Sequence, residues 1–327
     1  MLPASGAILV GFVVLIWGAD RFVIGAAALA RNLCVSPLLI GLTVVGLGTS
    51  APEILVSIMA AMQGNPALAV GNAVGSNIAN IGLILGVSAL IAPLSVKSHV
   101  LWREYPLLAG VSLAAYFMLA DGQLGRLDGL LMLAGLVGAM IWIVHLGRQR
   151  IAVAPLEDKF TEEIPADMST GTALAWTILG LLLLIASSRL LVWGAITIAT
   201  ALGVSGLVIG LTIIAIGTSL PELAASVVAT LRGEDDLAVG NVIGSNLFNM
   251  LAVLSVPGLI APAAVDTSVL SRDMPLMLVL TAALFFMGRG KRNHGIINRL
   301  EGGLLLTVFL AYQTWLYLSS QPTLPGT

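Results

Sequence analysis

Charged residues are scarce in this sequence. They make up 10% of its 327 residues, against roughly 25% in an average soluble domain, while 58% of the residues are hydrophobic. A single cysteine excludes an intrachain disulfide framework. The formal net charge of −2, without a basic cluster, argues against nucleic acid as a partner. The composition therefore argues against a water-soluble enzyme and predicts a polytopic membrane protein.

Long apolar segments take the place of the missing charges. A helix needs about 20 mostly apolar residues to span a bilayer, and charge-poor runs of about this length recur along the chain. We predict ten spans, near residues 5–30, 36–62, 67–94, 103–120, 127–146, 171–201, 206–231, 237–264, 273–289 and 299–319. The predicted fold class is an all-α polytopic protein embedded in the lipid bilayer.

The longest polar stretch, residues 147–170, divides the chain into two parts. We predict that residues 1–146 and 171–327 each form a unit of five helices, joined by this stretch as a linker. If the N-terminus faces outward, eleven of the 15 Lys and Arg residues fall in or beside inward-facing loops. Because positive loop residues favour the cytoplasmic side, we predict that both termini lie outside and that the linker is cytoplasmic.

An internal repeat with an offset of 169 residues dominates the sequence. Two pairs of segments match: GLTVVGLGTSAPE (41–53) with GLTIIAIGTSLPE (210–222), and AVGNAVGSNIAN (69–80) with AVGNVIGSNLFN (238–249). Over the signature regions 41–92 and 210–261, 25 of 52 positions are identical. Two homologous units with an odd number of spans enter the membrane from opposite sides. We therefore predict an inverted-topology repeat, which is typical of secondary transporters.

Two carboxylates occupy equivalent places deep inside predicted spans. Glu53 and Glu222 each end the first motif of their repeat. A charge at the centre of a membrane helix costs about 2.5–3.5 kcal/mol on insertion scales, and such residues usually mark ion or substrate pathways. The structural alternative is a protonated Glu that only bonds to a neighbouring helix. The symmetric placement favours the functional interpretation.

Both carboxylates follow hydroxyls and a helix-breaking proline. Thr49, Ser50 and Glu53 lie close to one helix face. Pro52 removes an amide donor, so we predict that carbonyls near residues 46–48 become available as ligands. The second repeat has the same pattern in Gly217, Thr218, Ser219, Pro221 and Glu222. Broken helices are tolerated at membrane depth where they line a cavity.

The second motif pair adds further polar groups. Ser76 and Asn80 lie four residues apart on one helix face, as do Ser245 and Asn249. The adjacent asparagines, Asn77 and Asn246, are predicted to form interhelical hydrogen bonds instead of binding an ion. Carboxylates, hydroxyls, amides and carbonyls together suit hard cations such as Ca²⁺, Na⁺ or Mg²⁺. Because Mg²⁺ loses its water reluctantly, a flexible cage without water favours Ca²⁺.

The paired motifs GTSAPE with GNAVGSNIAN, and GTSLPE with GNVIGSNLFN, resemble the two alpha-repeats of the calcium/cation antiporter superfamily, which includes the sodium/calcium exchangers. The resemblance covers nearly the whole chain and is nearest to compact prokaryotic exchangers without a large regulatory loop. It implies ten helices in a prokaryotic plasma (inner) membrane. The second, third, seventh and eighth helices would form the ion-binding core, against which the first and sixth would slide.

Carried over by position, the resemblance implies a complete ligand set. Glu53 and Glu222 would be the principal Ca²⁺ ligands. Ca²⁺ or Na⁺ would also be bound by Thr49, Ser50, Thr218 and Ser219, with the carbonyls of Gly46 and Ala215. Flanking Na⁺ ions would be held by Ser76 and Ser245, and the centre completed by Asn80 and Asn249. Several family members have Asp where this chain has Asn249, so this site has two carboxylates rather than three.

These features predict Na⁺/Ca²⁺ exchange by alternating access, with Ca²⁺ leaving the cytoplasm as Na⁺ enters. The ions are substrates; neither a cofactor nor an obligate protein partner is predicted. Exchange of Ca²⁺ for H⁺ stays open because protons could also neutralise the two carboxylates. K⁺-dependent exchange stays open because the superfamily that the sequence resembles also includes potassium-dependent members. A cation channel fits an inverted repeat with broken helices less well. An intramembrane enzyme would need a nucleophile–base pair or a metal-bound water, and no His lies deep in a predicted span.

Overall fold

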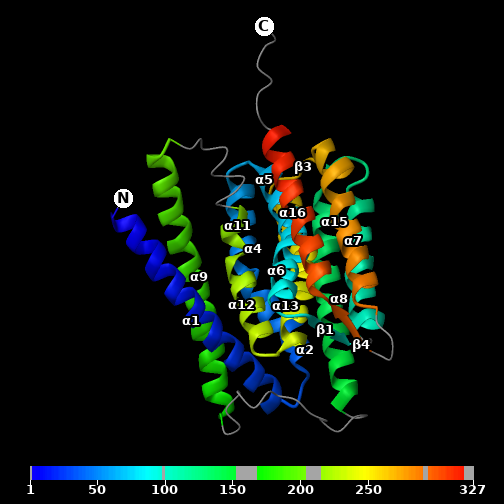
Figure 1. Ribbon diagram of the computed structural model, residues 1–327. Coiled ribbons are helices and arrows are strands. Elements are labelled where there is room, and N and C mark those ends of the chain that lie inside the picture. Colours follow the sequence, from blue (N-terminus) through cyan, green and yellow to red (C-terminus); the bar gives the residue numbers. More distant parts are fainter. Residues whose placement is uncertain (1, 98–99, 152–167, 204–214, 290–293, 320–327) are drawn as a thin grey trace.

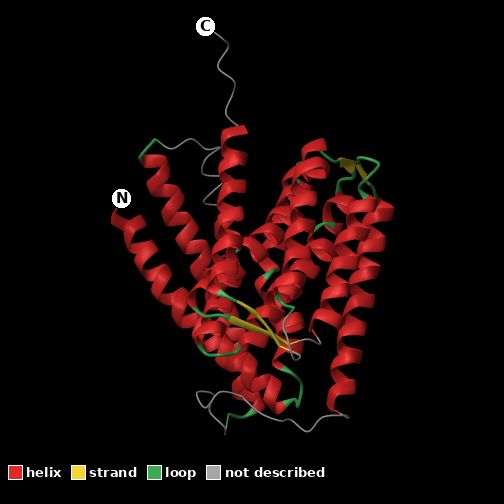
Figure 2. Cartoon of the chain, turned by 45° about the vertical axis from the view of Figure 1, so that its right-hand side comes forward, coloured by secondary structure: helices red, strands yellow, loops and turns green. Residues whose placement is uncertain are grey.

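The computed structural model describes residues 2–97, 100–151, 168–203, 215–289 and 294–319. This part of the chain is almost entirely helical, as Figures 1 and 2 show. The two longest helices, α1 (Leu2–Asn32) and α9 (Thr170–Ala201), pack along each other at one side of the remaining helices (Figure 1). The candidate ligands lie in those remaining helices.

Many of the other spans are built from short α-helices joined by π-helical turns, labelled η. The first half contains α2 (Pro37–Ile40), η1 (Gly41–Val45), α3 (Gly46–Thr49), α4 (Ala51–Met62), α5 (Pro66–Ala79), η2 (Asn80–Leu85), α6 (Gly86–Ile91), η3 (Val100–Glu104), α7 (Tyr105–Met118) and α8 (Arg126–Ile151). The second half contains α11 (Ala215–Thr218), α12 (Leu220–Leu231), α13 (Asp235–Phe248), η5 (Asn249–Val253), α14 (Ser255–Ile260), η6 (Val269–Asp273), α15 (Met274–Met287) and α16 (Arg299–Ser319).

The described residues do not account for all ten predicted spans. Within the described residues, seven helices are long and apolar enough to cross a membrane, or eight if the bent pair Pro37–Thr49 and Ala51–Met62 is one span. The predicted spans near 103–120 and 206–231 are not among them. The first consists of η3 with α7, and much of the second lies outside the described residues. The predicted linker also lies mostly outside them, although α8 extends into its first residues.

The π-helical turns recur at equivalent places in the two halves. Asn80 opens η2 and Asn249 opens η5, each at the end of the second motif. The turns η3 and η6 are likewise separated by the repeat offset. A π-helical turn inserts one residue into a helix and is frequent at functional sites. The sequence repeat is therefore also a repeat of backbone geometry.

Two short antiparallel ladders connect loops of the first half with loops of the second. β1 (Leu94–Lys97) pairs with β4 (His294–Ile297), so that Leu94 lies opposite Ile297. β2 (Gln123–Leu124) pairs with β3 (Ala263–Ala264), so that Gln123 lies opposite Ala264. In Figure 1, β1 and β4 lie toward the bottom of the molecule and β3 lies at its top.

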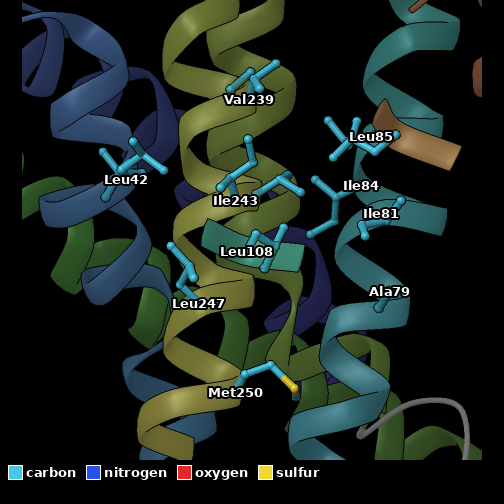
Figure 3. Close-up of a cluster of buried hydrophobic side chains, with 14 of the residues drawn as sticks. Leu42, Ala79, Ile81, Ile84, Leu85, Leu108, Val239, Ile243, Leu247 and Met250 are labelled. Carbon is cyan, nitrogen blue, oxygen red and sulfur yellow. The ribbon is translucent and has the colours of Figure 1, made fainter. Parts of the chain in front are cut away.

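Helix α13 lies at the centre of the packed core. All of its residues from Leu237 to Phe248 are buried. Figure 3 shows side chains of α13 beside those of η2; the labelled members include Val239, Ile243, Leu247, Ile81, Ile84 and Leu85. Because lipid is as apolar as these side chains, close packing rather than water exclusion holds such helices together.

Glycines allow α13 to approach the first half very closely. A Cβ added at Gly244 would lie 2.5 Å from the carbonyl oxygen of Leu42. One added at Gly240 would lie 3.1 Å from the Cα of Gly41. Real Cβ atoms do not approach backbone this closely, so glycine is required at least at Gly244. This contact brings the central helix of one repeat against the broken helix of the other.

Candidate ion-binding site

Each repeat has one helix that breaks directly before a proline-containing turn. The first breaks at Ser50, between α3 and α4, where its axis bends by about 40°. The second breaks at Ser219, between α11 and α12. The two serines share nearly the same backbone conformation, with φ −80° and ψ 2° at Ser50 and φ −87° and ψ 4° at Ser219. Pro52 and Pro221 follow each break and lack the N–H that would continue the preceding helix.

The two predicted carboxylates lie directly after these breaks. Glu53 is in the first turn of α4 and Glu222 in the first turn of α12, and each is 1% exposed. The N-terminal end of a helix has a partial positive charge that stabilises a carboxylate there. The two carboxylates are close enough to repel each other. A cation bound between them would relieve that repulsion.

Each carboxylate faces hydroxyl groups of the other repeat. The Ser50 hydroxyl donates a hydrogen bond to Glu222 Oε1 at 3.4 Å, and the Thr49 hydroxyl also lies against this carboxylate. In the opposite direction, the Thr218 hydroxyl lies against the carboxylate of Glu53. The broken helices of the two repeats therefore form one polar cluster.

Ser245 joins this cluster from α13. Its hydroxyl oxygen lies 3.4 Å from that of Thr49, and it donates to the carbonyl oxygen of Gly46 at 3.5 Å. Its repeat equivalent, Ser76, is buried in α5 but makes no side-chain hydrogen bond within the described part of the chain. The two halves of the cluster therefore differ in geometry although their sequences are alike.

The asparagines of the second motif bond between helices. Asn80 Nδ2 donates to Asn246 Oδ1 at 2.9 Å, and Asn77 Nδ2 donates to the backbone oxygen of Asn246 at 3.3 Å. These contacts confirm the interhelical bonding predicted for Asn77 and Asn246. Asn249 differs from its equivalent Asn80, because both of its side-chain amide atoms are buried without a partner among the described residues.

Two backbone carbonyls at the breaks are less available than the sequence predicts. The Gly46 oxygen accepts a backbone N–H at 3.1 Å as well as the Ser245 hydroxyl. The Gly217 oxygen, which the following proline leaves without its helical donor, accepts the Ser188 hydroxyl of α9 at 2.6 Å. The predicted carbonyl ligand at Ala215 lies beside residues 204–214, which are outside the described residues, and stays a prediction.

Several buried polar atoms of this cluster have no hydrogen-bond partner among the described residues. Those without a hydrogen bond of normal geometry include both carboxylate oxygens of Glu53, Oε2 of Glu222, Oγ of Ser219, Oδ1 of Asn80 and both amide atoms of Asn249. Each such atom costs about 1–3 kcal/mol, so a group of them requires an explanation. Most are oxygens, the ligands that hard cations prefer. Among the described residues, no group of three or more His, Cys, Asp or Glu is arranged so that it could hold a metal ion.

Two asparagines without a predicted role lie beside the carboxylates. Asn72 Nδ2 donates to the backbone oxygen of Glu53 at 3.1 Å, and Asn241 Nδ2 donates to that of Glu222 at 3.3 Å. Both follow a glycine at the same position of the second motif, 169 residues apart. That identity was a usable signal, but the sequence does not show that α5 and α13 pack back onto α4 and α12.

The family described as sodium/calcium exchanger protein matches this chain over residues 4–144 and 172–318. The two matched segments correspond to the two predicted five-helix units. The segment between the matches, residues 145–171, contains the predicted linker.

Individual relatives match nearly the whole chain. The inner membrane protein YrbG of Escherichia coli is 42% identical over 97% of this chain and 98% of its own length. The sodium/calcium exchanger MaX1 of Methanosarcina acetivorans is 30% identical over 95% of this chain and 97% of its own. A solved structure of the sodium-calcium exchanger NCX_Mj has a TM-score of 0.82 and 32% identity, covering 98% of this chain and 99% of that one.

Proposed function

Because the chain belongs to the sodium/calcium exchanger protein family, we propose that it is a secondary active antiporter that exchanges Na⁺ for Ca²⁺ by alternating access. Ca²⁺ leaves the cytoplasm as Na⁺ enters, and both ions are transported substrates. The observation that carries this proposal is the meeting of Glu53 and Glu222, one from each repeat, in a single buried cluster of oxygen atoms.

The proposed architecture is a ten-helix inverted repeat. The helices that add to the described spans are η3 with α7, and α11 with α12. The ladders support the inversion. By the repeat offset, β1 corresponds to β3, yet these two strands lie toward opposite ends of the molecule (Figure 1). Equivalent loops at opposite ends are what an inverted repeat requires.

The proposed orientation places both termini outside the cell and the β1–β4 ladder with the linker in the cytoplasm. The beginning of α1 and the end of α16 point toward the same end of the molecule (Figure 1). This arrangement agrees with an even number of spans. The excess of Lys and Arg in the loops assigned to the inside supports this direction. For a prokaryotic protein, the membrane concerned is the plasma (inner) membrane.

The proposed ligands are those that the two repeats supply together. Ca²⁺ is held mainly by Glu53 and Glu222, with hydroxyls and carbonyls that also serve Na⁺: Thr49, Ser50, Thr218, Ser219, Gly46 and Ala215. Ser76 and Ser245 hold flanking Na⁺ ions, and Asn80 and Asn249 complete the centre. The buried atoms without hydrogen bonds at Glu53, Glu222, Ser219, Asn80 and Asn249 support this assignment.

Exchange follows from the charge of the site. An empty site contains two buried carboxylates that repel each other, and buried charges without partners are costly. Bound Ca²⁺ or Na⁺ neutralises them, so that an occupied site can pass between its inward- and outward-facing states more readily than an empty one. Because both ions use the same carboxylates, one must leave before the other binds. This competition for the same carboxylates couples the transport of the two ions without a separate coupling element.

Uptake of ⁴⁵Ca²⁺ into proteoliposomes tests the proposal. Vesicles loaded with Na⁺ are compared with vesicles loaded with K⁺ and with acid-loaded vesicles. We expect uptake that requires internal Na⁺. Uptake driven only by the pH gradient would instead establish Ca²⁺/H⁺ exchange. Absence of gradient-driven uptake in all three would contradict Ca²⁺ transport.

A further inference from the structure

Asn241, on α13, links the two broken helices of the candidate site. Its Nδ2 donates to Ser226 Oγ at 2.9 Å and to the backbone oxygen of Glu222 at 3.3 Å, both on α12. Its Oδ1 accepts the hydroxyl of Thr49, on α3 of the other repeat, at 3.0 Å. Only 1% of the residue is exposed, so water does not compete freely for these bonds.

These partners fix the direction of the Asn241 amide. A side-chain amide donates through nitrogen and accepts through oxygen, and its orientation follows from its neighbours. The backbone oxygen of Glu222 can only accept, so it requires the amide nitrogen. The amide oxygen must then face Thr49, where it can only accept the hydroxyl proton.

The Thr49 proton has several competing acceptors. Besides Asn241 Oδ1, the Val45 backbone oxygen lies 3.1 Å and the Ser245 hydroxyl oxygen 3.4 Å from the Thr49 oxygen. The carboxylate of Glu222 lies against the same hydroxyl. A proton directed at Glu222 would occupy the space that a cation shared by the two groups needs. Thr49 can act as a cation ligand when its proton is held elsewhere.

We propose that Asn241 is a positioning residue for the cation site. It accepts the Thr49 proton, which leaves the Thr49 oxygen lone pairs to the cation, and it ties Thr49 to the backbone of Glu222. Two ligands from different repeats thereby keep a fixed separation. This inference rests on the proposed function, because it takes Thr49 and Glu222 as ligands of the transported ion.

Asn72, the repeat equivalent of Asn241, offers a matched comparison. It also donates to the backbone oxygen of the nearby glutamate, Glu53. It is only half-buried, and within the described residues its side chain makes no second hydrogen bond. Among the described residues, removal of Asn72 therefore takes away the bond to the backbone but no hydrogen bond with a hydroxyl of the other repeat.

Calorimetric titration of the purified full-length protein with Ca²⁺, in Na⁺-free buffer, tests the proposal. The variants are Asn241→Ala, Thr49→Val, the two combined, and Asn72→Ala. We expect Asn241→Ala and Thr49→Val each to raise the Kd for Ca²⁺ about tenfold, the equivalent of one hydrogen bond of about 1.4 kcal/mol. The double variant is expected to bind no more weakly than Thr49→Val, because Asn241 acts through Thr49. Asn72→Ala is expected to change the Kd less than about threefold.

A second measurement separates positioning from packing. In transport, Asn241→Ala should raise the KM for Ca²⁺ while the maximal rate changes little. The Tm of the ion-free protein should also fall, because the change leaves buried partners without their hydrogen bonds. A lower Tm with unchanged Kd would overturn the proposal, as would effects that multiply in the double variant to about a hundredfold. If the wild-type protein does not bind Ca²⁺, the proposed Ca²⁺ transport fails, and Na⁺ titration of the same variants tests Asn241 by the same criteria.

Discussion

Ser50 and Glu222 are 172 positions apart in the sequence, yet the Ser50 hydroxyl donates a hydrogen bond to Glu222 Oε1. The serine lies at the helix break of one repeat and the glutamate follows the break of the other. The hydroxyls of each repeat thus face the carboxylate of its partner. We infer that neither repeat forms the complete site alone.

The first prediction concerns this contact. Ser50→Ala removes a donor to a charged group, a bond worth about 1.5 kcal/mol at the lower end of the usual range. We expect the Kd for Ca²⁺ to rise about tenfold in calorimetric titration. Ser57→Ala is the control, because Ser57 is buried on the same helix but donates to the Val253 backbone oxygen. Equal effects of the two changes would argue against a role of Ser50 in the site.

The second prediction concerns the approach of the two repeats. A Cβ at Gly244 would clash with the Leu42 backbone, so Gly244→Ala should destabilise the protein by about 1–3 kcal/mol. Gly138 on α8 is exposed and has no described atom within 4 Å of such a Cβ, so Gly138→Ala is a control that is not expected to destabilise the protein. Thermal unfolding in detergent measures both. Similar losses in the two variants would contradict a specific close approach at Gly244.

The third prediction concerns the charge of the site. Asn249→Asp adds a third carboxyl group at a buried position whose amide atoms lack partners among the described residues. A site with three negative charges is not neutralised by Ca²⁺ alone, so bound Ca²⁺ then favours an added proton. We expect Na⁺-dependent Ca²⁺ uptake by this variant to depend more steeply on pH than uptake by the wild type. If the variant and the wild type had the same pH profile, the carboxyl group at position 249 would not contribute to the charge of the ion site.

The fourth prediction concerns α1. Arg232 Nε, just after α12, donates to Asp20 Oδ1 at 2.9 Å, and the two side chains are 18% and 28% exposed. The contribution of a partly buried ion pair to stability lies between that of a surface pair, which is small, and the large loss caused by breaking a fully buried pair. We expect Asp20→Asn to lower stability by about 1–2 kcal/mol, measured as a lower Tm. Asp20→Glu retains the charge and should recover most of the loss; no difference between the two variants would contradict an electrostatic contribution.

Much of the helical architecture could be predicted because long apolar segments admit few alternatives in a membrane. The predicted span 5–30 lies within α1, and the predicted span 171–201 nearly coincides with α9. The breaks could be anticipated from the prolines. The π-helical turns could not, because one extra residue in a helical turn leaves no distinct pattern in apolar spacing.

The site was less accessible to sequence reasoning than the fold. The repeat identified both glutamates and their hydroxyl neighbours, because identical polar residues at two buried places have few structural explanations. Asn241 was missed because its partners come from α12 and α3, and only the packed structure brings these elements together. The Gly217 carbonyl was predicted to be a free acceptor, because Pro221 has no N–H to donate to it. In the structure the hydroxyl of Ser188, on a helix distant in sequence, donates to it instead.

Ca²⁺ titration calorimetry of the full-length protein shows whether Glu53 and Glu222 share one cation site. The titration compares the wild type with Glu53→Gln and Glu222→Gln, which preserve shape but remove one charge each. We expect one Ca²⁺ per chain in the wild type and a Kd raised at least about a hundredfold in either variant. A variant that still binds one Ca²⁺ with wild-type affinity would contradict a shared site.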